Sequence, residues 1–520
     1  MNHTWSRSVA GATFNLVLVF AAGPLAAALP ATAPTALAFK AGFAERDITP
    51  AIGMEQPGGY SKAFHRVLHD PCKVRAAVFD DGAGRVAVVG LDALAIRRPT
   101  VEAARIAICA KCGIIPQAIL ISASHSHSAG PTVMVLPGEY DDASDLVKTL
   151  AYEKSSCADP KYLAIVEQAI VEAVVDANDH RVAAKAAAGF GMEGSAVFNR
   201  RFRMKNGLSF THPGQGNPEI VEPAGPIDPQ VGVVGAWDAD GKLLGCVVNY
   251  ACHATTGPGG ISADYICYIE KTIGGLMGEQ AIVVFVPGAA GDVTQVDNRC
   301  PWQIKQFGED SARLVGGRVG AEAVKVLLGL KSGAGPLAPL AFESAKLQIR
   351  RRVPSPEHLA RALEIAQKGP PKKLDSTEWV FAKETVLLDA KLKKEPIASV
   401  EVQAIQVGPA VFLACPAEYF CQYGLDIKAG SKFPVTLPVS LANDCVGYVP
   451  TEEAFGPHGG GYETRLTSYS NLEPRAGRLI ADALIRLSAG LTPGKVPQPP
   501  ALPEFKGRPW GYGNLPPQLD

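Results

Sequence analysis

The stretch Ala118–Ser128 (AILISASHSHS) decides how this chain is interpreted, because an apolar, β-branched run leads directly into two histidines. Such a run predicts a buried strand, and side chains at positions i and i+2 of a strand point to the same side. His125 and His127 would therefore face one way at the end of the strand. Two imidazoles so placed suit a metal site, or a metal ligand beside an acid–base group. The same spacing also fits structural histidines, so other parts of the sequence are needed to distinguish a metal or acid–base site from a structural pair.

The bulk composition favours a large globular protein. The chain has 520 residues, 47% of them hydrophobic, with 50 basic and 51 acidic side chains. A formal net charge of −1 argues against nucleic acid as a partner. Arg7 followed by the apolar run Phe14–Ala28 predicts an export signal over residues 1–38, with an uncleaved membrane anchor as the alternative. We therefore expect a periplasmic or extracellular protein.

Strand and helix patterns alternate along the chain, which predicts an α/β fold with mixed sheets flanked by helices. We expect strands at 74–79, 85–90, 243–250, 281–286 and 400–413, and helices at 98–110, 162–178, 265–278, 311–330 and 472–488, with a helical hairpin over 356–394. No clean linker interrupts residues 39–490, so one large catalytic domain is expected there. Residues 491–520 form a proline-rich tail that we expect to run over the surface.

Eleven cysteines in an exported chain would leave at least one thiol unpaired. Cys109 and Cys112 form a C-x-x-C motif within a predicted helix. Without a second such pair, thiols buried by the helix or one local disulfide are better interpretations than zinc binding.

Further polar clusters follow apolar strands, as the two histidines do. They are His253 in Cys246–Thr256, the glycine-rich Val283–Val296 (VVFVPGAAGDVTQV), Glu418 in Val411–Phe420, and Leu441–Thr451 with the glycines and Tyr462 beyond it. In open α/β sheets ligands bind at the carboxyl ends of strands, so we expect the clusters to meet there. Each alone also fits a structural histidine, a bare turn or a solvated loop.

Together, His125, His253 and Glu418 would give two imidazoles and one carboxylate, a common ligand set of catalytic zinc. Zinc lowers the pKa of bound water toward neutral, which suits attack on a carbonyl. His127 would then bind the developing oxyanion or carry a proton. Asp264, after His253, would contact a ligand histidine or cap the next helix.

As a set, these segments resemble the neutral/alkaline non-lysosomal ceramidases, zinc-dependent amidases that cut the N-acyl bond of ceramide. The matching pieces are Phe43–Pro50 (FAERDITP), Ser122–Thr132 (SASHSHSAGPT), Asn199-Arg200, Asn249–Thr256 (NYACHATT), Gly288–Thr294 (GAAGDVT), Pro416–Glu418, and Asn443–Thr451 followed by Tyr462-Glu463. They occur in family order and span the family's catalytic domain.

The resemblance implies four zinc ligands: His125, His253, Glu418 and Tyr448. It also implies that His127, Arg200 and Tyr462 contact the amide and hydroxyls of the substrate. Thr294 stands where the family usually has a catalytically important serine. Family members also continue into an immunoglobulin-like domain beyond the length of this chain.

These observations predict a hydrolase that binds Zn²⁺ and cleaves the amide bond of an N-acyl lipid or ceramide-like substrate. Thr294 would hold or orient water or substrate. The partner is a small-molecule or lipid amide, and peripheral contact with a membrane is compatible with it; the oligomeric state stays open. The alternatives are an envelope protein that binds ligand without catalysis, suggested by Thr294, and an esterase with the same metal site.

Overall fold

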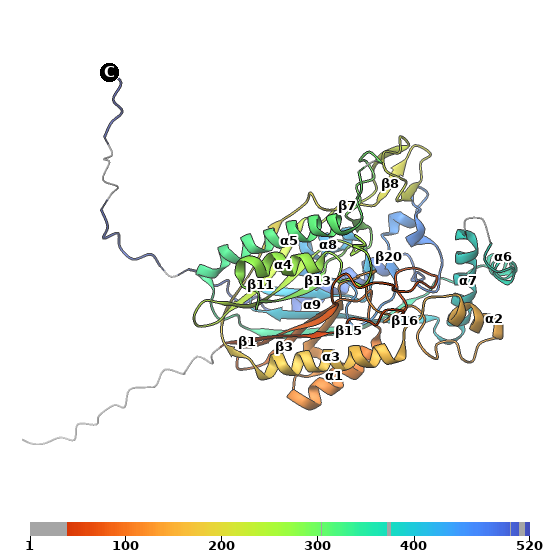
Figure 1. The fold of residues 1–520 in the computed structure, drawn as a ribbon, viewed down its shortest axis with the longest axis horizontal. Helices are drawn as coiled ribbons and strands as arrows, with labels where there is room; N and C mark the ends of the chain where they lie inside the picture. The colour runs from red at the N-terminus through yellow and green to blue at the C-terminus, as the bar shows by residue number, and fades with distance from the viewer. Residues whose placement is uncertain (1–38, 303, 372–375, 500, 509–514) are drawn as a thin grey trace, which may run out of the picture. The chain divides into compact units, whose positions relative to one another are not determined.

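The structure, a computed structural model, describes residues 39–302, 304–371, 376–499, 501–508 and 515–520 (Figure 1). The described residues form one compact unit. Within it, three larger sheets pack against one another and helices cover their outer faces, so the predicted α/β class is confirmed. The expected export signal at residues 1–38 lies outside the described residues.

The first sheet has five strands in the order β4-β3-β2-β1-β5. They are β1 (Lys40–Asp47), β2 (Lys73–Asp80), β3 (Arg85–Leu91), β4 (Ile119–Ala123) and β5 (Val182–Ala183). The two strands expected at 74–79 and 85–90 are present as β2 and β3, which pair antiparallel around a short turn. Helix α3 (Pro160–Asp179) packs on β1 and β2, and α1 (Arg98–Cys112) lies beside it. Apolar side chains of both helices join the core beneath the sheet.

The second sheet has the order β13-β12-β11-β6. Its strands are β6 (Lys185–Met192), β11 (Gln230–Trp237), β12 (Leu243–Tyr250) and β13 (Ile282–Pro287). Helices α4 (Ile266–Met277) and α5 (Glu309–Leu330) pair on its outer face (Figure 1). Gly316 and Gly320 of α5 make this close packing possible, because a Cβ at Gly316 would meet the Tyr265 carbonyl oxygen at 2.2 Å.

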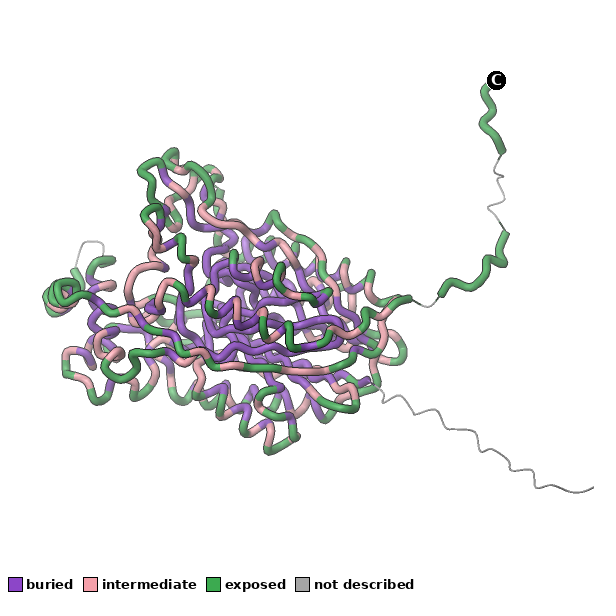
Figure 2. The backbone as a smooth tube through the Cα atoms, turned by 180° about the vertical axis from the view of Figure 1, so that it is seen from behind, coloured by how far each residue is buried: buried purple, intermediate pink, exposed green. Residues whose placement is uncertain are grey.

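The third sheet has the order β15-β16-β17-β19. Its strands are β15 (Leu340–Arg350), β16 (Ile397–Val407), β17 (Ala410–Ala414) and β19 (Val435–Val439), and α9 (Ala476–Gly490) packs on it beside α8 (Cys421–Gly430). One apolar core joins the three sheets, with Val88, Val284 and Phe412 all fully buried in it. Figure 2 shows this buried interior surrounded by exposed loops.

Hydrogen bonds tie the carboxyl ends of strands from the three sheets together. The pairs β3–β4, β12–β13 and β17–β19 are parallel, so the loops after them start at shared edges. Asn249 donates its amide to the carbonyls of Val286 and Pro438, which join the second and third sheets. The Asn443 backbone N–H donates to the Ile121 carbonyl of the first sheet. The strand ends at which the sequence predicts the site therefore lie close together.

Short strand pairs and two peripheral parts complete the molecule. Strands β7 (Phe198–Asn199) and β14 (Val293–Thr294) pair, as do β18 (Glu418–Tyr419) and β20 (Tyr448–Val449). A small sheet contains β8 (Arg201–Met204), β9 (Ser209–Thr211) and β10 (Ile220–Pro223). The predicted helical hairpin is present as α6 (Pro356–Gln367) and α7 (Thr377–Lys394). It packs on α2 (Asp145–Lys148) and a π-helical turn (Thr149–Glu153) through a separate apolar cluster.

The tail begins against the third sheet, where the Gly494 N–H donates to the Gly408 carbonyl, and residues 501–508 are exposed. All eleven cysteines are free, so Cys109 and Cys112 are thiols rather than a disulfide. In the described part of the chain, no helix has both the length and the apolar character needed to span a bilayer.

Candidate metal centre and substrate cavity

His125 and His127 converge because the chain turns after β4, not because they alternate along a strand. The strand ends at Ala123, and His125 has a φ of 68°, a left-handed conformation that is rare for a residue with a side chain. The two Nε2 atoms are 3.3 Å apart. The expectation that both imidazoles face one way is met, although the strand geometry behind it was wrong. Strained backbone of this kind is often found at functional sites.

Backbone carbonyls fix the rings of His125 and His253. His125 Nδ1 lies 2.8 Å from the Leu94 carbonyl oxygen, and His253 Nδ1 lies 2.6 Å from that of Ala290. A carbonyl oxygen only accepts hydrogen bonds, so each Nδ1 carries the proton and each Nε2 offers its lone pair. Burial and the charge of Arg200 lower the pKa of His253 to about 3, which keeps this ring neutral.

Glu418, on β18, completes the convergence. One carboxylate oxygen, Oε2, lies 3.0 Å from His125 Nε2 and 3.1 Å from His253 Nε2. The other oxygen accepts a hydrogen bond of 2.8 Å from the Tyr469 hydroxyl. The carboxylate is therefore held in one orientation, with Oε2 directed at the two histidines.

This donor set fits a cation. His253 Nε2 and Glu418 Oε2 are both buried and have no hydrogen-bond partner, although each is an acceptor that needs one. The remaining acceptor, His125 Nε2, lies 3.3 Å from His127 Nε2. A cation bound among His125 Nε2, His253 Nε2 and Glu418 Oε2 would satisfy all three acceptors. Two imidazoles and one carboxylate are ligands that zinc accepts.

His127 belongs to the same cluster. Ring nitrogens of His125, His127 and His253 lie within 4.8 Å of one another, so the three histidines are an alternative ligand set. Burial and the neighbouring histidines lower the pKa of His127 well below its usual value. His127 is less buried than the other two rings and lines the adjacent cavity, which favours a role toward substrate.

Tyr448 lies beside Glu418 because β18 and β20 pair in parallel with these two residues in register. Its ring stacks at 9° to that of His253, with 6.4 Å between ring centres. Burial and the charge of Glu418 raise the pKa of Tyr448 well above its usual value, so the phenol keeps its proton unless a cation offsets that charge.

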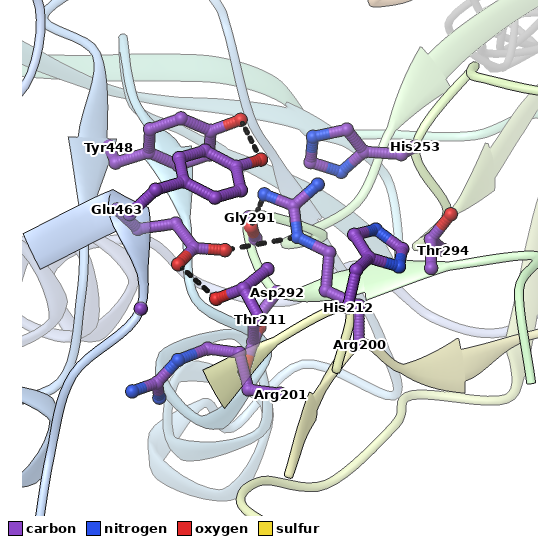
Figure 3. Close-up of polar contacts among 12 residues, drawn as sticks. Arg200, Arg201, Thr211, His212, His253, Gly291, Asp292, Thr294, Tyr448 and Glu463 are labelled. Atoms are coloured by element: carbon purple, nitrogen blue, oxygen red, sulfur yellow. Dashed lines mark hydrogen bonds and ion pairs between the residues drawn. The ribbon is translucent and has the colours of Figure 1, made fainter. Parts of the chain in front are cut away.

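Arg200 lies against Tyr448 (Figure 3), and Tyr462 contacts both residues. The Tyr448 and Tyr462 hydroxyls are 3.2 Å apart, and the Arg200 guanidinium lies 5.4 Å and 5.3 Å from the centres of these rings. Arg200 Nε donates to Glu463 at 3.1 Å, and Nη2 donates to the Gly291 carbonyl at 2.8 Å. The guanidinium is thus fixed before any ligand binds.

Thr294 bonds to a different set of side chains. Its hydroxyl donates to Gln295 Oε1 at 2.8 Å and lies 3.3 Å from the Thr255 hydroxyl. Figure 3 shows Thr294 on the His212 side of Arg200, and it is not among the residues that line the cavity described next. Asp264 does not bond to His125 or His253; it accepts from the Thr256 hydroxyl and from backbone N–H groups of its own loop.

A cavity of about 370 Å³ opens beside the cluster, within the usual size range of small-molecule sites. Apart from the polar residues already described, its walls are apolar or aromatic: Gly58, Gly59, Tyr60, Leu94, Met134, Phe381 and Tyr469. The cavity therefore suits a hydrocarbon group next to a polar reacting centre.

Several residues of this site carry no signal in the sequence. Tyr469 and Glu463 act through contacts that only the fold creates, and the ring partners of the histidines are backbone carbonyls. In the sequence, Glu463 stands out only as the neighbour of Tyr462. A tyrosine in a polar loop, such as Tyr469, is normally a rim residue, so spacing alone could not have identified it.

The fold is an α/β architecture that two solved ceramidase structures share. The structure is similar to neutral ceramidase from Pseudomonas aeruginosa, with a TM-score of 0.62 and 20% identity over 89% of this chain and 76% of that one. It is also similar to a structure of ceramidase complexed with C2, with a TM-score of 0.63 and 19% identity over 90% and 78% of the two chains. The resemblance found in the sequence is confirmed at the level of the fold. No family model matches the chain, and no curated protein is significantly similar to it.

Proposed function

We propose that this protein is a zinc-dependent hydrolase that cleaves the amide bond of an N-acyl lipid or ceramide-like substrate. The observation that carries the proposal is the convergence of His125 Nε2, His253 Nε2 and Glu418 Oε2, two of them without a partner, beside an apolar cavity. The similar ceramidase folds support the same chemistry. A zinc ion held there, with Tyr448 as a further ligand, would polarise the carbonyl and supply a water of lowered pKa.

The other residues act directly on the substrate in this proposal. Neutral His127 accepts a proton from the attacking water and delivers it to the nitrogen of the leaving amine. Arg200 and Tyr462, fixed by Glu463 and by each other, position the amide and its hydroxyls and stabilise the oxyanion. The apolar walls hold the acyl chain and exclude bulk water.

Metal analysis of the purified protein tests the proposal most directly. We expect about one zinc per chain, and we expect a chelator to abolish hydrolysis of N-acyl amides, with zinc restoring it. Protein that contains no transition metal as purified and takes none up would overturn the proposal.

Matched substrates separate the amidase from the esterase. An amide and an ester with the same acyl and leaving groups are compared, and we expect the amide to be cleaved by the zinc-loaded enzyme. An enzyme that cleaves only the ester is the esterase alternative. A zinc-loaded protein that binds N-acyl amides but turns over neither substrate, also as Thr294→Ser, is the non-catalytic binding protein.

We also propose that the protein is exported to the periplasm or beyond, with residues 1–38 as the signal. The apolar run Phe14–Ala28 after Arg7 supports this location. N-terminal sequencing of protein recovered from the native host's envelope or medium tests it, with a new terminus expected near Ala28 or Ala38.

A further inference from the structure

One loop, residues 462–472, supplies side chains to both parts of the site, and we call it the site loop. Glu463 accepts the hydrogen bond that fixes Arg200, and the Tyr469 hydroxyl donates to Glu418, a predicted metal ligand. Beyond a short 3₁₀ turn at the start of the loop, residues 465–471 lie in no helix or strand. A loop with so little regular structure needs contacts from outside to hold these side chains in place.

The side chain of Arg352, two residues after β15, bonds to three backbone carbonyls of the site loop. Nη1 donates to the Thr464 carbonyl at 2.9 Å, Nη2 to that of Ser470 and Nε to that of Leu472, both at 3.0 Å. The Arg352 backbone N–H also donates to the Asn471 carbonyl at 2.6 Å. One arginine thus joins both ends of the irregular part of the loop to the chain that follows β15.

The surroundings of Arg352 direct its charge at these carbonyls. Among the residues that the structure describes, no carboxylate forms an ion pair with it, and burial lowers its pKa to about 10, so it stays protonated at neutral pH. The guanidinium lies 4.8 Å from the centre of the Phe455 ring. A planar guanidinium presents its N–H donors as a fixed fork, so the three carbonyls that it binds keep fixed relative positions.

We propose that Arg352 is a positioning residue for the metal centre. It is not among the residues that line the cavity, and it acts through the site loop. By fixing the backbone on both sides of Tyr469, it keeps the hydroxyl of that residue directed at Glu418 Oε1. This hydrogen bond holds the carboxylate in the orientation that presents Oε2 to the two histidines. The inference rests on the proposed function, since it takes Glu418 as a metal ligand.

Zinc affinity tests the proposal without any substrate. Protein stripped of metal is titrated with zinc in competition with a chelating dye, well below the melting temperature of each variant. We expect Arg352→Met to bind zinc about tenfold more weakly, at the low end of the effect of groups that orient a metal ligand. Arg352→Lys keeps the charge but loses the fork, and we expect its affinity to fall by at least about threefold. Unchanged zinc affinity in Arg352→Met overturns the proposal.

A double-mutant cycle with Tyr469→Phe shows whether Arg352 acts through Tyr469. Tyr469→Phe removes the hydroxyl that orients Glu418, so we expect it alone to weaken zinc binding by about 10- to 100-fold. Arg352→Met added to that variant should then have little further effect, because two residues that act through the same contact are not additive. If the two effects multiply in full, Arg352 does not act through Tyr469 and the positioning role is contradicted.

Arg181→Met is the matched control for the loss of a half-buried arginine. Arg181 also donates to a backbone carbonyl, that of Asn178 at the end of α3, and it pairs with Asp80, which like Asn178 lies outside the site. We expect this control to lower the melting temperature and to leave zinc affinity unchanged, and equal weakening by Arg181→Met overturns the proposal.

The same titrations separate this inference from the proposed hydrolysis. Weaker zinc binding by the Arg352 variants supports the positioning role even if no amide is cleaved. Equal zinc affinity in all variants of an active hydrolase overturns the positioning role alone. A protein that takes up no zinc overturns the proposed function and the positioning role together.

Discussion

At the scale of single residues, His125 and His127 have different surroundings despite their spacing. Both rings line the cavity, but the His125 ring is buried, is held by the Leu94 carbonyl and faces Glu418, whereas the His127 ring is partly exposed and lies against Gly58. The strained φ of 68° at His125 places its ring, and a two-residue step then brings His127 alongside. This asymmetry predicts that the two residues have separable roles.

Alanine substitutions should separate the two histidines. We expect His125→Ala to lose zinc and to lose activity by a thousandfold or more, because a ligand is removed. His127→Ala should keep about one zinc and lose kcat by about 10² to 10⁴, the usual contribution of a general acid–base group. Metal content and kcat are measured on the same preparations. Loss of zinc from both variants would instead favour the three-histidine ligand set.

Gly58 offers a second test of His127 without changing the histidine. Gly58 has a φ of 117°, and a Cβ there would meet His127 Nδ1 at 2.4 Å, so Gly58→Ala should displace the ring. We expect zinc to be retained and kcat to fall at least about tenfold. Gly59→Ala is the matched control, because a Cβ at Gly59 would have no other atom within 4 Å. Equal effects of the two substitutions would contradict the placement of His127.

At the scale of elements, α7 holds the cavity wall in place. Lys383 is fully buried on this helix, and its ammonium donates to the Tyr60 carbonyl and to Glu384, both at 2.7 Å. Phe381, two residues earlier on the helix, packs near Tyr60 with 5.9 Å between ring centres. The helix and the loop at Gly58–Tyr60 are therefore joined by one buried cation and one aromatic pair.

Replacing this cation should destabilise the protein. Lys383→Met leaves the buried Glu384 carboxylate without its cation and with the Ser468 hydroxyl as a donor, and breaking a buried ion pair costs about 3–5 kcal/mol. We expect a fall of several degrees in the melting temperature, measured calorimetrically. Lys393→Met on the same helix removes an exposed pair with Asp389 and should change stability by less than about 1 kcal/mol. A small effect of Lys383→Met would show that α7 is held by its apolar contacts alone.

Regular elements with strong periodicity were predictable from the sequence. Strand β12 occupies the predicted residues 243–250, and α4 and α5 differ from prediction by one or two residues at their ends. The sheet β8–β9–β10 was missed, because its strands are three or four residues long and have little apolar alternation. For the site, the sequence predicted only that the polar clusters meet at the carboxyl ends of strands. The turn at His125 and the contact of Tyr469 with Glu418 depend on tertiary packing.

At the scale of the whole molecule, the eleven free cysteines contrast with the predicted export. Seven of them are buried, and burial raises the pKa of such thiols, to about 12 for Cys246 and Cys415. A protonated, inaccessible thiol reacts slowly with oxidants. The core is therefore compatible with an oxidising compartment without any disulfide.

Thiol titration tests whether all the cysteines remain free thiols. We expect eleven reactive thiols per denatured chain, and this number does not depend on removal of residues 1–38, because the first cysteine is Cys72. We also expect a reductant to leave the melting temperature unchanged within about 1 °C. Nine or fewer thiols in protein recovered from the host would show that a disulfide forms.

The rings of His125 and His253 are held by the carbonyls of Leu94 and Ala290, and every amino acid supplies a backbone carbonyl. No amino-acid substitution at position 94 or 290 removes these carbonyl acceptors; a substitution can only shift their positions. A saturation mutagenesis screen would therefore record the two positions as tolerant of small apolar residues. Single substitutions would therefore not reveal the carbonyl acceptors that set both tautomers. Only a change in the path of the backbone would remove these acceptors.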